Sequence, residues 1–95
     1  MATFTGDFKK GMKIGGSTYK DFELRELTTA DMLDAELISP SNKPMNFNAA
    51  MASLQLVRVG DYTGPFTLNM IRALHPKDYD AIVDGLNEVA KLGED

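Results

Sequence analysis

Three groups of residues in this 95-residue chain have types and spacings that could perform chemistry. In the first group, Gly11 and Gly16 have the spacing of a phosphate-binding loop. The position that must be Lys is Ser17, so the charge that would hold the β- and γ-phosphates is missing. We therefore interpret the glycines as part of a tight turn and not as a nucleotide site.

The second group is formed by the single histidine, His75, and an acidic cluster of Asp31, Asp34 and Glu36. A general base needs an orienting partner and a nucleophile within reach, and the sequence around His75 supplies neither. The cluster lacks the ordered oxygen spacing and central glycine of a calcium loop, and it resembles the acidity that favours a helix N-terminus. Because the chain also has no cysteine, we expect no enzyme activity, no metal and no other cofactor.

The third group is an acidic row in which Asp80, Asp84 and Glu88 are spaced by four residues and share one helix face. Two interpretations remain open. The row is either a solvated face opposite the apolar stripe of the same helix or a docking surface for a basic partner helix. The six methionines have a similar ambiguity, because methionine fills irregular gaps in a core and also suits surfaces that adapt to a partner.

Composition narrows the class of protein further. A length of 95 residues predicts one domain, and a hydrophobic fraction of 43% predicts that it folds. The net charge of −4 argues against nucleic acid as a partner. No apolar run approaches the ~20 residues of a membrane span, so we expect no membrane partner.

The pattern along the chain predicts an α+β fold in which an N-terminal β-hairpin, residues 8–25, precedes three or four α-helices in residues 28–92. Gly15-Gly16 suits the positive φ angles of the hairpin turn. Thr28 and Asp31 have the spacing of a capping box, flanked by Leu27 and Met32 as a hydrophobic staple. The core-facing positions of this first helix are expected to be Ala30, Leu33 and Leu37.

Three more helical segments follow. The first begins near Asn46, with a core-facing stripe that continues to Val57, and a short helix spans residues 66–74. The last helix begins at Pro76 after a hinge, and its stripe keeps helical spacing throughout. We expect Gly85 to allow a close helix approach. The stripe of this helix is formed by Tyr79, Ile82, Val83, Leu86, Val89 and Ala90.

The segment Leu24 to Glu36, with the sequence LRELTTADMLDAE, resembles the tail assembly chaperones of Mu-like and related contractile-tailed bacteriophages. The family's motif reads approximately Leu-Arg-Glu-Pro/Leu-Thr-x-x-Asp after a glycine-containing hairpin. The segment Leu54 to Phe66 and the Asp78-Tyr79 helix start are similar to the second half of the family. The resemblance covers about residues 15–92, and the residues that match the motif are Leu24, Arg25, Glu26, Thr28 and Asp31.

This resemblance implies a non-catalytic protein that binds the tape measure protein and keeps it soluble while tail-tube subunits assemble. Such chaperones act in the host cytoplasm and are absent from the mature virion. The resemblance also implies that this chain is the short, non-frameshifted form and that it forms homo-oligomers. Further partners would be the tail tube protein and a frameshifted longer form of the chain.

We expect the partner-contact surface to be bordered by Met45, Phe47, Asp80, Asp84 and Glu88. Arg25 and Glu26 are instead expected to form an intramolecular pair that fixes the hairpin on the helices. The alternative function is a structural tail or connector component that is retained in the virion.

Overall fold

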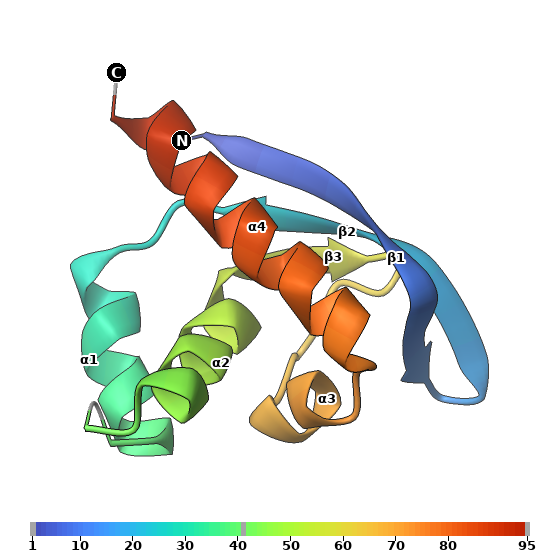
Figure 1. Ribbon diagram of the computed structural model, residues 1–95, viewed down its shortest axis with the longest axis horizontal. Helices are drawn as coiled ribbons and strands as arrows, with labels where there is room; N and C mark the ends of the chain where they lie inside the picture. Colours follow the sequence, from blue (N-terminus) through green and yellow to red (C-terminus); the bar gives the residue numbers. More distant parts are fainter. Residues whose placement is uncertain (1, 41, 95) are drawn as a thin grey trace.

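The computed structural model describes residues 2–40 and 42–94. The α+β prediction is confirmed, because an N-terminal hairpin is followed by helices and a third strand completes one antiparallel sheet of order β1-β2-β3. Helix α4 crosses one face of this sheet, while α1, α2 and α3 lie to one side of α4 (Figure 1). The elements of this described part are β1 (Thr3–Ile14), β2 (Ser17–Arg25), α1 (Thr29–Ile38), α2 (Pro44–Gln55), β3 (Leu56–Val59), α3 (Leu68–Arg72) and α4 (Pro76–Gly93).

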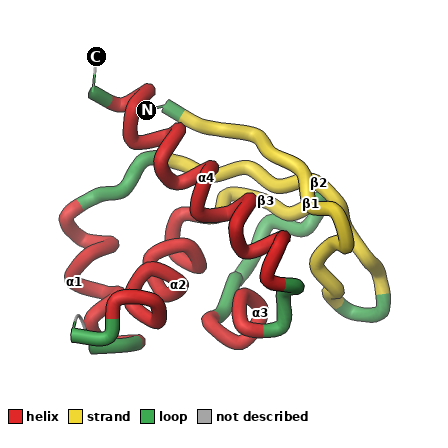
Figure 2. The backbone as a smooth tube through the Cα atoms, viewed as in Figure 1, coloured by secondary structure: helices red, strands yellow, loops and turns green. Residues whose placement is uncertain are grey.

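The hairpin turn lies at Gly15 and Gly16, as predicted. Their φ angles of 58° and 85° belong to the left-handed region that two-residue hairpin turns require and that glycine adopts without steric cost. The first strand begins at Thr3, earlier than the expected residue 8. The hairpin is therefore longer than predicted, and its turn extends past the helices (Figure 2).

β1 contains a bulge that explains its imperfect hydrophobic alternation. Four residues of β1, from Phe8 to Gly11, lie opposite Lys20 alone in β2. Gly11 has a φ of 98°, which again favours glycine. Phe8 and Met12, on either side of the bulge, are both buried, at 4% and 2% exposure, whereas Lys9 and Lys10 between them are exposed.

The prediction that the second helix continues to Val57 is wrong at its C-terminal end. α2 stops at Gln55, and the chain passes directly into β3, where Val57 is exposed. Leu56 and Val59 are buried, and β3 pairs with β2. The segment is a strand because the fully buried β2 residues Phe22 and Leu24, which pair with Val59 and Leu56, gain apolar cross-strand neighbours there.

The capping box of α1 is confirmed. The Asp31 backbone N–H donates to Thr28 Oγ1 at 3.2 Å, and the Thr28 N–H donates to Asp31 Oδ2 at 2.9 Å. Caps of this kind stabilise a helix by about 1 kcal/mol. Leu27 and Met32 hold the staple positions, but both are exposed, at 41% and 46%.

The predicted core face of α1 is wrong. Leu33 and Leu37 are 63% and 87% exposed, whereas the buried residues of α1 are Asp31 and Ala35. α1 packs on α2, and Ala35 on the buried side permits a close approach. In this orientation Asp31 pairs with Arg25 at the end of β2. An apolar face of α1 therefore remains exposed.

The core lies between the sheet and α4. Ile82 is fully buried in the core cluster with Phe22 and Leu24. Gly85 permits the close approach that the sequence predicted, because a Cβ there would lie 2.8 Å from Leu24 Cδ1 and 3.1 Å from Phe4 Cδ2. The opposite face of the sheet is polar, with Arg58 of β3 paired to Asp21 and Glu23 of β2.

Candidate functional site

An ion pair holds the hairpin against the helices. Arg25 donates to both carboxylate oxygens of Asp31, at 2.7 and 2.8 Å, and to the carbonyls of Glu26 and Leu54, both at 2.9 Å. Arg25 is therefore structural, as expected, but its ion-pair partner is Asp31 and not Glu26. Glu26 accepts instead from the Ala2 backbone N–H at 2.8 Å.

The protonation of Asp31 follows from these contacts. The hydrogen bonds from Arg25 lower the pKa of Asp31 from its ordinary value of 3.8 to about 2, against the opposing effect of burial, and Thr28 adds to the lowering. Asp31 is thus charged at neutral pH. A bidentate guanidinium–carboxylate pair of this geometry fixes the direction in which β2 leads into α1.

Asp78 is a second structural carboxylate, whose role the sequence did not reveal. Its side chain is fully buried and accepts from the backbone N–H groups of Lys9, Lys10 and Gly11 at 2.7, 3.0 and 3.0 Å. Burial opposes ionisation, but the three hydrogen bonds outweigh it and lower the pKa of Asp78. Asp78 therefore joins the first turn of α4 to the bulge of β1. A bulge leaves backbone N–H groups unpaired, and because the bulge itself was not predicted, the sequence carried no signal for the acceptor that these groups need.

His75, which was considered as a general base, has a structural role. His75 is the N-cap of α4, which begins at Pro76 as predicted, and the His75 Nδ1 accepts from the Lys77 N–H at 3.1 Å. No group of three or more acidic or histidine side chains that could hold a metal ion occurs in residues 2–40 and 42–94. Within the same residues, no helix has the length and apolar character needed to span a membrane.

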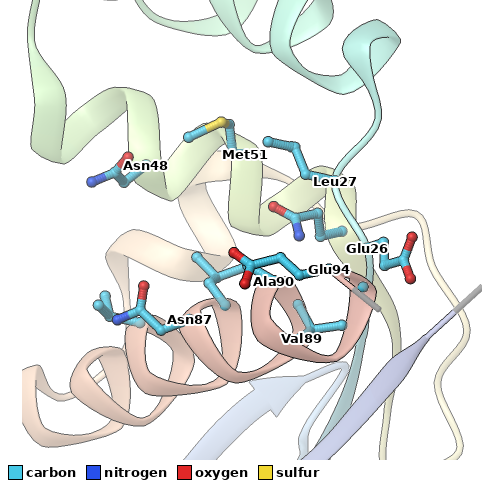
Figure 3. A pocket seen from close by; sticks show the side chains of 12 residues that line it. Glu26, Leu27, Asn48, Met51, Asn87, Val89, Ala90 and Glu94 are labelled. Atoms are coloured by element: carbon cyan, nitrogen blue, oxygen red, sulfur yellow. The ribbon is translucent and has the colours of Figure 1, made fainter.

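A groove of about 390 Å³ lies between α2 and α4, and the linker between β2 and α1 contributes to its wall. We call it the α2–α4 groove. Met51 of α2 faces Ala90 of α4 across it, and Leu27 projects from the linker (Figure 3). It is lined by Glu26, Leu27, Asn48, Met51, Gln55, Val83, Leu86, Asn87, Val89, Ala90, Gly93 and Glu94.

The polar side chains of the α2–α4 groove are amides and carboxylates. Asn48 and Asn87 come from opposite walls, and Glu26 and Glu94 supply the two carboxylates (Figure 3). None of the described lining residues is Lys or Arg. The groove thus combines apolar walls with a negative edge.

The predicted contact residues lie partly beside this groove. Met45 is 74% exposed, and its carbonyl accepts from the Tyr79 hydroxyl at 3.5 Å, so the first turns of α2 and α4 meet there. Asn48 and Val83, one turn farther along the two helices, already line the groove. Phe47 is half-buried on α2.

Asp80, Asp84 and Glu88 are all exposed on α4, and Glu88 lies 3.6 Å from Lys91. None of the three lines the α2–α4 groove in the described part of the chain. The acidic row therefore lies outside the groove.

Some methionines fill the core, and others lie on the surface, where they could adapt to a partner. Met12 is buried in the core, whereas Met32 and Met45 are exposed. Met51 is half-buried in the groove wall.

The sequence contains a signal for the groove, although helical spacing alone does not distinguish it from core. The apolar stripe of α4 is wider than the sheet covers, so Ile82 and Val89 are buried while Val83 is half-buried and Ala90 is exposed. When an apolar stripe is wider than the surface against which it packs, the residues at its margin stay partly exposed. Here these residues form one wall of the groove.

Together, the fold and the groove define a small α+β domain with a negatively edged apolar groove on its helical side. The chain belongs to the family described as tail assembly protein gp41, which matches residues 8–94. The expected kinship with tail assembly proteins of Mu-like phages is thus confirmed at the level of the family.

A curated relative agrees with this assignment. The Mu-like prophage FluMu protein gp41 of Haemophilus influenzae is 27% identical over an alignment of 84 positions, and the match covers 76% of this chain and 66% of that protein. The chain thus spans just under two thirds of the length of this relative. No solved structure matches the chain.

Proposed function

We propose that this chain is a tail assembly chaperone that binds the tape measure protein and keeps it soluble while the tail tube assembles. Membership of the tail assembly family supports a role in this process. The observation that carries the proposal is the open apolar α2–α4 groove, together with the exposed apolar face of α1 at Leu33 and Leu37. Exposed apolar surface of this kind marks an interaction site in a small soluble domain.

The proposed mechanism is transient covering of apolar surface, without catalysis. A tape measure protein is largely helical and exposes apolar stripes until tube subunits surround it. The chain would shield these stripes in the host cytoplasm and leave before the virion is complete. The tail tube protein, a frameshifted longer form and further copies of the chain are proposed as additional partners.

The predicted contact surface remains part of the proposal. Met45 is exposed at the end of α2 that faces Tyr79, and Asp80, Asp84 and Glu88 present negative charge along α4. We propose that this charge attracts basic partner segments and keeps neighbouring copies of the chain apart. Phe47, which is half-buried, would border the same surface.

Co-expression with the tape measure protein of the same phage tests the function. The soluble fraction of the tape measure protein should rise when this chain is present, and the two should purify together. The triple variant Asp80→Lys, Asp84→Lys, Glu88→Lys should lower the soluble fraction, since it reverses the charge of the row. Equal solubility with the variant would remove the acidic row from the contact surface, and equal solubility without any chain would refute the chaperone role.

The alternative, a structural component of the tail, makes a different prediction about the particle. Mass spectrometry should detect the chain in lysates of infected cells but not in purified virions. Its presence in virions at a fixed number of copies would establish the alternative.

A further inference from the structure

We propose that the α2–α4 groove receives apolar side chains of an amphipathic partner helix that carries Lys or Arg beside them. The inference rests on the proposed function for the protein that supplies this helix, and it goes further by naming the site and the chemistry of the segment.

The volume determines how a partner can bind. About 390 Å³ accommodates a few side chains, but a helix is roughly 10 Å across and is too wide to enter such a space. A partner helix must therefore lie across the opening and insert anchors spaced three or four residues apart, as in other helix-in-groove complexes. The anchors would meet Met51 on one wall and Val83 and Leu86 on the other.

Met51 gives the groove a wall that adapts to its occupant. Methionine is unbranched and flexible, and it is overused where a surface accepts several apolar shapes. The opposite wall ends at Ala90, which is exposed and leaves room where a larger residue would close the groove. These walls fit Leu, Ile or Met anchors of differing shape, as a series of segments along one long helical protein would offer.

Charge determines what lies beside the anchors. Glu26 and Glu94 edge the groove; Oε1 of Glu26 accepts from the Ala2 N–H, and within residues 2–40 and 42–94 no hydrogen bond involves Oε2 or the Glu94 carboxylate. The described lining residues include no cation, and the chain as a whole has a net charge of −4. Lys or Arg on the partner would complement this edge, and acidic residues would be repelled.

The negative edge of the groove also disfavours a second copy of the chain as occupant. The exposed apolar helix that another copy could offer is α1, with Leu33 and Leu37. Asp34 and Glu36 are exposed on α1, and its sequence contains neither Lys nor Arg. Insertion of α1 would bring acidic residues against an acidic edge.

Two variants block the groove from opposite walls. Ala90→Arg and Asn48→Arg each place a long cation at an exposed lining position, so neither disturbs the core. Thr18→Arg is the matched control, since it adds the same charge at an exposed position of the hairpin, away from the groove. Thermal unfolding followed by circular dichroism confirms that all three variants fold.

Each variant of the 95-residue chain is co-expressed with the tape measure protein, and the affinity of the purified pair is measured. We expect binding to weaken at least tenfold for both groove variants and to stay within twofold of wild type for Thr18→Arg. Glu94→Gln should weaken binding a fewfold and reduce its dependence on salt, because it removes one charge from the edge. Cross-linking of a photoreactive residue at position 90 should map to apolar residues flanked by Lys or Arg.

The outcomes separate this inference from the proposed function. If the wild-type chain binds the tape measure protein and both groove variants bind equally well, the inference is overturned while the chaperone function stands. If the wild-type chain does not bind it, the proposed function fails first. A groove variant that loses only self-association, measured by analytical ultracentrifugation, would identify a second copy as the occupant and also overturn the inference.

Discussion

Asp31→Asn tests whether the Arg25–Asp31 pair joins the hairpin to the helices. The substitution preserves the shape of the side chain but removes its charge and one of its acceptor oxygens. The Asp31 side chain is 8% exposed and that of Arg25 is 29% exposed, so the lost contacts are poorly replaced by water. The capping hydrogen bond from the Thr28 N–H to Oδ2 is disturbed as well.

The lowered pKa of Asp31 determines how much free energy of unfolding the substitution should remove. A shift from 3.8 to about 2 means that the folded protein favours the charged form by about 2 kcal/mol. We therefore expect the free energy of unfolding to fall by about 2 kcal/mol in Asp31→Asn at about pH 7. Urea denaturation followed by circular dichroism measures this difference. Asp34→Asn is the control, since Asp34 is exposed on the same helix, and it should change stability by less than about 0.5 kcal/mol.

The pH dependence provides a second, independent readout. Because the folded-state pKa of Asp31 is lowered, its contribution is present above the unfolded pKa of 3.8 and is lost as the pH falls toward about 2. The difference between wild type and Asp31→Asn should therefore shrink as the pH falls from about 5 to about 2. Equal stability of the Asp31 and Asp34 variants at neutral pH, or a difference that persists unchanged in acid, would refute this reasoning.

Three further substitutions test other parts of the fold. Asp78→Asn should lower the free energy of unfolding, measured by urea denaturation, by about 3 kcal/mol, because an amide cannot accept all three hydrogen bonds from the backbone N–H groups of the bulge. A loss below about 1 kcal/mol would contradict this. Gly85→Ala should lower the melting temperature although alanine favours helices, since its Cβ would lie 2.8 Å from Leu24 Cδ1; a higher melting temperature would show that Leu24 yields. Leu37→Ser should leave the urea midpoint nearly unchanged because Leu37 is 87% exposed, and a large loss would mean that the side chain is covered.

Local signals in the sequence predicted local structure well. The turn at Gly15 and Gly16, the capping box of Thr28 and Asp31 and the start of α4 at Pro76 all depend on residues close in the chain. Such signals identify a turn or helix end because the steric and hydrogen-bond requirements are met within one or two turns.

Features that depend on distant residues could not be predicted in this way. Leu56 to Val59 forms a strand because β2 is available to pair with it, and helical spacing alone gave no indication of this. The orientation of α1 places Asp31 against Arg25 of the preceding strand and leaves Leu33 and Leu37 exposed, which the apolar pattern of the helix did not indicate. The same dependence on tertiary packing explains why spacing alone does not distinguish the residues that line the α2–α4 groove from core residues.

The chaperone proposal is tested most directly with purified components. Tape measure protein is diluted from denaturant, and its aggregation is followed by light scattering with and without an equimolar amount of this chain. We predict that the chain suppresses the scattering and that the two proteins elute together in size-exclusion chromatography. Scattering curves that coincide with and without the chain would contradict the proposal.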